Sequence, residues 1–135
     1  MFYKDVGAGI VSKIDEQIIK IVYTDAYEIE KHHAKEIADA FYDACEGKPA
    51  YCLTDMQGQY NAFTAEAQKY LSNEAPVIRK KLVLASAIVV DNLANRLIAK
   101  FFITFYKPAY PAKVFKSNEE GLAWLNELKE KKAKK

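Results

Sequence analysis

Hydrophobic and polar residues alternate near the start of the chain, and the apolar period then lengthens. Residues 10–14 and 18–23 are two runs rich in β-branched side chains, and two acidic residues separate them. This pattern predicts an antiparallel β-hairpin. Between Tyr27 and Ala44, apolar side chains recur every three or four positions, which predicts an amphipathic helix that ends at Gly47.

The rest of the chain repeats a step from strand to helix. Residues 50–54 form a short apolar run, and residues 82–90 are almost continuously apolar, as expected of strands buried on both faces. The second of these runs should be a central strand. A shorter strand is predicted at residues 114–115, after a segment that contains two prolines.

Three further helices are predicted from their capping residues and from apolar spacing. Thr64 can cap a helix over residues 64–72, and Asn92 can cap one over residues 93–106. Ser117 and Glu120 have the spacing of a capping box before the last helix. The element order is therefore ββαβαβαβα, which predicts an α/β fold with a mixed sheet of four to five strands and about four helices.

Length and charge indicate one domain followed by a basic tail. The chain has 135 residues, half of them hydrophobic, which suits a single core over residues 1–128. Residues 129–135 hold five lysines and one glutamate, and without apolar spacing we expect this tail to be disordered. The formal net charge is +2, so the body without the tail carries 2 − 4 = −2. We therefore expect no nucleic-acid partner, unless cations cluster locally.

The chain shows no sign of export or membrane insertion. It begins without the pattern of a signal peptide, and its apolar runs are shorter than the roughly 20 residues that cross a bilayer. Cys45 and Cys52 lie seven positions apart, which fits neither a redox motif nor a zinc-ligand pair. Both are expected to be buried free thiols, and the protein is expected to be cytoplasmic.

Known catalytic motifs are missing from the sequence. It contains no nucleophile elbow, phosphate-binding loop, dinucleotide fingerprint or zinc-protease motif. The adjacent His32 and His33 would point about 100° apart on a helix and would not easily share a metal ion, and His33 falls on the apolar side. We expect no enzymatic activity, no cofactor and no metal site.

Polar residues at the ends of the two inner strands are the best geometric indication of a site. Asp55 follows the first inner strand, Asp91 and Asn92 follow the second, and ligands of open α/β sheets bind at such ends. Arg96, one turn later, could hold an anion there. The alternative is structural, because Asp and Asn favour turns and caps, and Arg96 could pair with Asp91 or Asn92 on the surface.

The helix over residues 93–106 carries more apolar side chains than one core-facing side needs. Phe101, Phe102 and Phe105 are part of this wide apolar surface. Most of it should be core. The excess could be covered by a second copy of the chain, another protein or a lipid tail, so these phenylalanines are candidate contact residues.

Three segments resemble the bacterial STAS/Sec14-like family, also called SpoIIAA-like. They are VVDNLANRLIAKFF at residues 89–102, KPAYPAKVF at residues 107–115 and GLAWL at residues 121–125. The resemblance spans residues 10–128. It implies a STAS-like domain with a four- or five-stranded sheet, helices mainly on one face, and binding of partners or small apolar ligands without catalysis.

The phosphorylation switch of anti-sigma-factor antagonists in this family needs an Asp-Ser-Ser-Gly run at a helix start. This chain has TDMQGQYNAFTAEA there, at residues 54–67. Thr64 is the hydroxyl residue at a comparable helix start, so it is the candidate phosphorylation site. An ordinary helix cap explains Thr64 equally well, and the switch is expected to be absent.

Three functions are therefore open. The first is a regulatory or signalling interaction module that binds as a homodimer or to another protein. The second is a Sec14-like carrier or sensor of a lipid or small apolar anion, with Arg96 or Lys100 near the head group. The third is an enzyme that uses Asp55, Asp91 or His33, which would require titratable groups to converge in one cleft.

Overall fold

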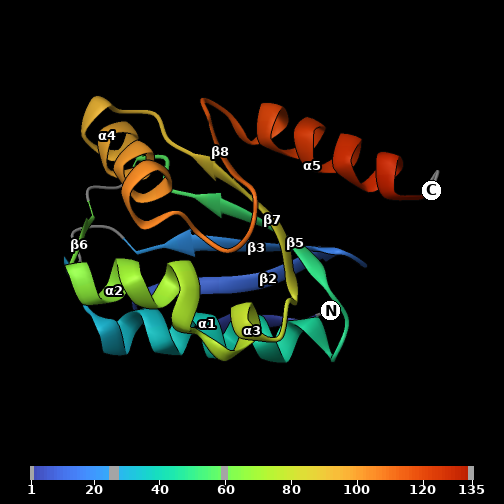
Figure 1. Ribbon diagram of the computed structural model, residues 1–135, viewed down its shortest axis with the longest axis horizontal. Helices are drawn as coiled ribbons and strands as arrows, with labels where there is room; N and C mark the ends of the chain where they lie inside the picture. Colours follow the sequence, from blue (N-terminus) through green and yellow to red (C-terminus); the bar gives the residue numbers. More distant parts are fainter. Residues whose placement is uncertain (1, 25–27, 59–60, 134–135) are drawn as a thin grey trace.

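A six-stranded mixed β-sheet forms the centre of the protein, which we describe from a computed structural model over residues 2–24, 28–58 and 61–133 (Figure 1). The strand order is β1-β2-β3-β5-β7-β8, and a separate parallel pair joins β4 to β6. The strands are β1 (Tyr3–Asp5), β2 (Gly9–Asp15), β3 (Ile18–Tyr23), β4 (Glu28–Ile29), β5 (Ala50–Asp55), β6 (Ala62–Phe63), β7 (Val83–Val89) and β8 (Ala112–Phe115).

The predicted hairpin is present and leads into parallel strands. β2 and β3 pair antiparallel, and β3, β5, β7 and β8 are parallel neighbours. Asp15 Oδ1 closes the hairpin turn by accepting the N–H groups of Gln17 at 2.8 Å and Ile18 at 3.0 Å. The sheet has six strands where the sequence predicts four to five, because β1 adds an antiparallel edge next to β2. β7 is an interior strand, but it lies beside the edge strand β8.

Each predicted helix is present, and two of them continue into π-helical turns. The second ends in η1 before a short α3, and the third ends in η2. The helices are α1 (Lys31–Cys45), α2 (Ala65–Lys69), η1 (Tyr70–Glu74), α3 (Pro76–Arg79), α4 (Leu93–Phe101), η2 (Phe102–Tyr106) and α5 (Asn118–Ala133). The start predicted for the first helix, Tyr27, lies outside the described residues. No helix of the described ranges combines the length and apolar character needed to span a membrane.

The predicted capping residues occupy the helix starts. Thr64 Oγ1 accepts the N–H of Ala67 at 3.1 Å, and Asn92 Oδ1 accepts that of Asn95 at 2.8 Å. Ser117 Oγ accepts the N–H of Glu120 at 3.2 Å. These hydrogen bonds confirm the three predicted caps. The caps could be predicted because each depends only on neighbouring residues.

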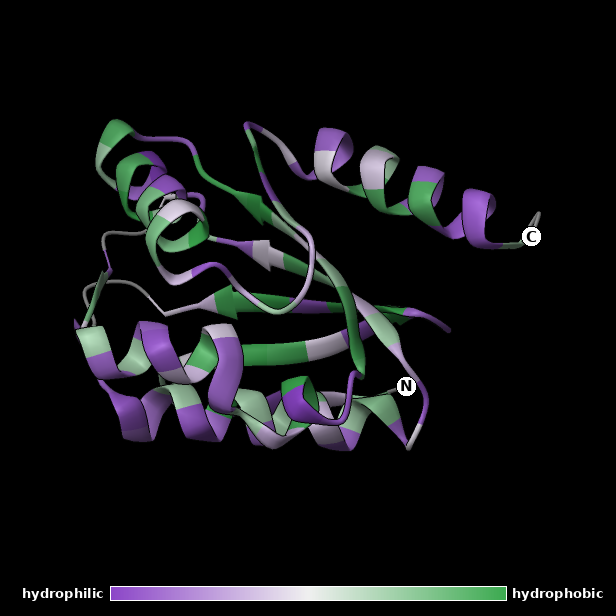
Figure 2. Ribbon diagram, viewed as in Figure 1, coloured by the Kyte–Doolittle hydropathy of each residue, from purple (hydrophilic) through white to green (hydrophobic). Residues whose placement is uncertain are grey.

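The sheet separates two hydrophobic cores. The larger core lies between the sheet and the helices α1 to α4, and the smaller one lies under α5 on the other face. Leu125 of α5 is fully buried there beside Leu53 of β5 and Val89 of β7. Figure 2 shows that hydrophobic residues concentrate in the strands between these layers. Helices thus cover mainly one face, with α5 alone on the other.

The basic tail departs from the prediction of disorder, because α5 continues through Ala133. Lys and Glu are good helix formers, and a helix already nucleated by packing gains one hydrogen bond for each added residue. Glu127 and Lys131 also pair at 3.1 Å, and Lys129 lies 3.7 Å from Asp15. Residues 134–135 lie outside the described part of the chain.

Candidate functional site

Four large apolar side chains form an exposed line along α4 and η2, which we call the α4–η2 ridge. Leu93, Leu97, Phe101 and Phe105 are 69%, 58%, 50% and 64% exposed. They recur every fourth residue, so they lie on one side of the helix. The rings of Phe101 and Phe105 stack with centroids 4.9 Å apart. The ridge therefore presents a continuous apolar surface to solvent.

The segment that carries the ridge is basic. Between Asn92 and Asn118 the sequence has five cations and no Asp or Glu. None of these cations forms an ion pair with a carboxylate of the described residues. The net charge of the chain without its tail does not reveal this local excess of positive charge. It is the local clustering of cations that the expectation of no nucleic-acid partner left open. The five cations are Arg96, Lys100, Lys107, Lys113 and Lys116.

The carboxylates at the strand ends hold neighbouring segments of the fold together. Asp55 Oδ1 accepts the N–H of Gln57 at 3.0 Å, and its Oδ2 accepts Asn118 Nδ2 at 3.1 Å. Lys20 Nζ lies 3.6 Å from the same Oδ2. Both oxygens of Asp91 lie 3.0 Å from the N–H of Gly58, which has a positive φ of 71°. These contacts give both aspartates the structural role that was the alternative to a ligand site.

The other predicted site residues fall into separate places. Asp91, Asn92 and Arg96 line one shallow depression together with Lys116, so the structure does bring them together. Thr64 caps α2 and does not line this depression. Phe101 and Phe105 belong to the ridge, whereas Phe102 points to the other side of the helix.

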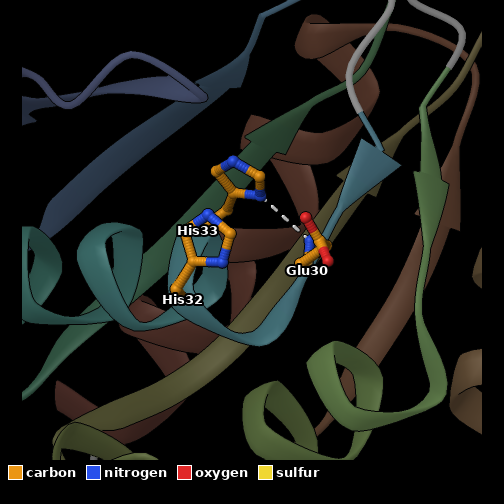
Figure 3. Close-up of side chains that lie close together, drawn as sticks. All are labelled: Glu30, His32 and His33. Carbon is orange, nitrogen blue, oxygen red and sulfur yellow. Dashed lines mark hydrogen bonds between the residues drawn. The ribbon is translucent and has the colours of Figure 1, made fainter.

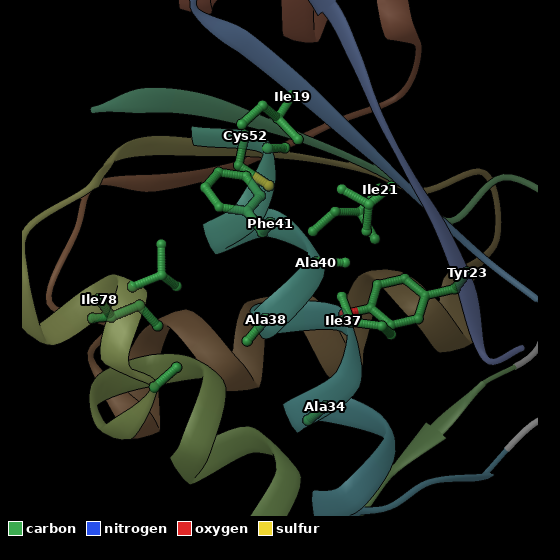
Figure 4. Close-up of a cluster of buried hydrophobic side chains, with 14 of the residues drawn as sticks. Ile19, Ile21, Tyr23, Ala34, Ile37, Ala38, Ala40, Phe41, Cys52 and Ile78 are labelled. Carbon is green, nitrogen blue, oxygen red and sulfur yellow. The ribbon is translucent and has the colours of Figure 1, made fainter. Parts of the chain in front are cut away.

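An apolar cavity of about 110 Å³ lies on that other side, inside the larger core. It is lined by residues of β3, β5 and β7 and of all the helical segments from α1 to η2. Figure 4 shows part of this wall, where Phe41 of α1 lies beside Cys52 of β5. Native interiors contain few voids larger than a water molecule, and a void of this size costs about 2–3 kcal/mol when empty. Such a cavity is therefore a candidate ligand site.

The few polar groups of the cavity wall are mostly paired within the protein. Cys52 Sγ lies 3.3 Å from Thr54 Oγ1, and the Tyr110 hydroxyl donates to the carbonyl of Leu71 at 2.9 Å. Burial raises the pKa of the Cys52 thiol to about 11, against the opposing effect of hydrogen bonds to Thr54 and Ser86. Burial also raises the pKa of Tyr110.

Glu30, His32 and His33 are the third group of interest, because their potential metal-ligand atoms lie within 4.8 Å of one another (Figure 3). The rings of His32 and His33 are closer than the expected angle of 100° between the two side chains implies, with centroids 3.9 Å apart. However, His33 Nδ1 accepts the N–H of Glu30 at 3.0 Å, and the Glu30 side chain accepts the N–H of His33. This reciprocal pair is a helix N-cap, and both groups already serve α1.

The basic run was visible in the sequence, but the cavity was not. Its wall combines residues from many strands, helices and loops, such as Gln68, Ser86 and Tyr110, and no local spacing links them. They meet only because the parallel strands and their crossovers bring distant segments to one face of the sheet.

Comparison with known proteins agrees with this architecture. A family model described as Domain of unknown function (DUF7793) matches residues 12–129. Among solved structures, the chain is similar to an uncharacterised protein from the DUF3478 family with a SpoIIAA-like fold, from Shewanella loihica PV-4. The two share 12% identity and a TM-score of 0.56, over 87% of this chain and 92% of that one. No curated protein matches the chain. The SpoIIAA-like resemblance is thus confirmed for the fold.

Proposed function

We propose that this chain, which belongs to the DUF7793 family, is a non-enzymatic STAS-like interaction module that binds an anionic phospholipid surface through its α4–η2 ridge. The observation that carries the proposal is the ridge itself, with four exposed apolar side chains on a segment that has cations and no carboxylates. Interfacial helices share this composition, with Phe and Leu on one side and Lys or Arg beside them.

The exposure of the ridge is the first step of the argument. Scattered exposed hydrophobic residues are common, but contiguous ones mark surfaces that bind something. Phe101 and Phe105 are already ordered against each other, so burying them would cost little side-chain entropy. The ridge lies opposite the buried side of α4, on which Asn95 and Ala99 face the core, so it can reach a flat surface.

The positive charge beside the ridge favours an anionic membrane over a second copy of the chain or another protein. An antiparallel, two-fold symmetric contact between two ridges would place Arg96 and Lys100 of one copy beside those of the other, which opposes the homodimer expected from the sequence. Protein partners usually present both signs of charge around an apolar centre. A membrane leaflet rich in anionic lipid is negative throughout, and it attracts nearby Lys and Arg side chains by about 1 kcal/mol each.

The absence of catalysis is part of the proposal. It is supported by the roles of Asp55, Asp91 and His33, the three residues that an enzymatic function would use. Asp55 accepts a hydrogen bond that closes a turn, His33 accepts one that caps α1, and Asp91 accepts the N–H of Gly58 in a neighbouring loop. Their side chains are therefore engaged in the fold.

Cosedimentation with vesicles tests the proposal directly. We expect the protein to bind vesicles with about one third phosphatidylserine in phosphatidylcholine, and to bind pure phosphatidylcholine at least about tenfold more weakly. The variant Phe101→Ser/Phe105→Ser should lose binding to both. Arg96→Gln/Lys100→Gln should lose only the preference for phosphatidylserine, and added salt should have the same effect.

Tyr3→Ser is the matched control, because Tyr3 is 68% exposed but lies on the edge strand β1. It should bind vesicles like the wild type. Equal binding by the ridge variant and the wild type would overturn the proposal. If vesicles are not bound and native mass spectrometry shows a dimer that Phe101→Ser abolishes, the ridge is an interface between two copies instead.

A further inference from the structure

The apolar cavity inside the larger core is independent of the ridge, and it has the properties of a site for a small molecule. Its volume is about 110 Å³. An engineered apolar cavity of about 150 Å³ in another protein stays dry and binds benzene, so a single ring is the right size here. The acyl chain of a phospholipid is far larger. The cavity therefore fits a small ligand rather than the lipid that the Sec14-like resemblance implies.

The charge of the ligand follows from the wall. No Lys, Arg, His, Asp or Glu lines the cavity among the described residues. Arg96 lines the separate shallow depression, and Lys100 is exposed on α4, so neither can neutralise an anion in the cavity. Burying an ion without a partner is very costly. The ligand must be neutral, in contrast to the anionic ligand expected from the sequence.

One polar side chain of the wall points to the chemistry of the ligand. Gln68 Nε2 donates to the carbonyl of Phe63 at 3.2 Å, and this bond sets the orientation of the amide. Gln68 Oε1 is buried and accepts no hydrogen bond from the described residues. Buried acceptors are rarely left in this state. A ligand that carries one hydrogen-bond donor would satisfy it.

The wall around this acceptor is held in place by hydrogen bonds within the protein. η1 contributes Leu71 and η2 contributes Phe102, and π-helical turns are rare and occur often at functional sites. The segment after η2 is bonded to η1, since the N–H of Ala109 donates to the carbonyl of Ser72 at 3.0 Å and Tyr110 donates to Leu71. These bonds do not depend on what fills the cavity, so the site is preformed.

We infer that the cavity binds a neutral, single-ring-sized apolar molecule with one hydrogen-bond donor, which donates to Gln68 Oε1. The ring lies among the aliphatic and aromatic side chains of the wall. Phenol is the simplest probe with these properties. Toluene has the same size, with a methyl group in place of the hydroxyl, and is the matched probe without a donor.

Titrations of the two probes, followed by amide chemical shifts of cavity residues, test the inference. We expect both probes to shift the signals of lining residues such as Ile78 and Ile88, with saturable binding. In the variant Gln68→Met, which keeps the length of the side chain but removes the acceptor, the affinity for phenol relative to toluene should fall about tenfold. Ala99→Val narrows the cavity and should lower the affinity for both probes.

The possible results of these titrations decide whether the cavity inference holds. If neither probe shifts the cavity signals, or if Gln68→Met leaves the ratio of the two affinities unchanged, the inference is overturned. Should Ala99→Val fail to fold, the comparison of the two probes in the wild type and Gln68→Met still decides. The ridge variants Phe101→Ser/Phe105→Ser should bind phenol like the wild type, so failure of the lipid proposal leaves this result intact.

Discussion

Phe101 and Phe102 are neighbours in the chain, but their side chains lie in different surroundings. Phe101 is 50% exposed on the α4–η2 ridge, and Phe102 lines the apolar cavity. The wide apolar surface predicted for residues 93–106 is thus two surfaces, one exposed to solvent and one that lines the cavity. Each has its own consequences for stability and binding.

Alanine substitution should separate these two roles. Phe102→Ala removes a ring from the cavity wall and should lower the free energy of unfolding by about 2 kcal/mol, because it enlarges a void that is already present. Phe101→Ala removes mostly exposed surface and should cost less than about 1 kcal/mol. Urea unfolding measures both. Equal losses would mean that the two rings are packed alike.

Gly121 lies at the contact between α5 and the sheet, and its replacement by alanine should destabilise the protein. A Cβ there would lie 3.0 Å from Leu53 Cδ1 and 3.3 Å from both Ala87 Cβ and Val89 Cγ2, all of them buried. Helix propensity favours alanine by about 1 kcal/mol, but overpacking costs about 1–3 kcal/mol. We expect a net loss of about 1 kcal/mol in urea unfolding.

Asn126→Ala is the control for this substitution, because Asn126 is exposed on the same helix. It should leave the stability unchanged or raise it by a few tenths of a kcal/mol. A stabilised Gly121→Ala variant would show that the small core under α5 can expand.

The two buried thiols predict a loss of stability at alkaline pH. Burial raises the pKa of Cys45 and of Cys52 from 9.0 to about 11. Between pH 9 and 11 the unfolded chain releases these protons while the folded chain keeps them, so the free energy of unfolding should fall as pH rises. The slope is at most about 1.4 kcal/mol per pH unit for each thiol.

Urea unfolding at pH 8, 9 and 10 checks this slope. The variant Cys45→Ala/Cys52→Ala should show a shallower decline over the same range. Some decline should remain toward higher pH, because burial also raises the pKa of Tyr23 and Tyr110. Identical slopes in the two proteins would contradict the assignment to the thiols.

The cap at the start of α1 gives a test of the Glu30, His32 and His33 group. His33→Ala removes the acceptor of the Glu30 N–H and should lower the free energy of unfolding by about 1 kcal/mol. His32→Ala, at an exposed position, should change it by less than about 0.5 kcal/mol. A thermal melt with added zinc should show no stabilisation, whereas a rise that needs both histidines would assign a metal site.

The sequence predicts well what depends on neighbouring residues. Thr64, Asn92 and Ser117 are caps because the acceptor and the N–H it serves lie within three positions of each other. The order of strands and helices also follows from local periods. β1 was missed because its three residues are all exposed and show no alternation.

The candidate site was predictable only in part. Arg96, Asp91 and Asn92 do meet, as their places at a strand end and a helix start suggested. The exposure of Phe101 and Phe105 and the partial burial of Phe102 could not be read from residue type, because all three are equally apolar. Gln68 gave no signal at all, since its role depends on segments from most of the fold.

The segment from Leu93 to Tyr106 is at once an outer contact surface and an inner wall. A molecule in the cavity and a membrane on the ridge would therefore press on the same helix from opposite sides. Thermodynamic reciprocity then requires that any factor by which the cavity ligand changes the affinity of the ridge equals the factor by which the membrane changes the affinity of the cavity. A single measurement of phenol affinity with and without vesicles would report the communication between the two faces.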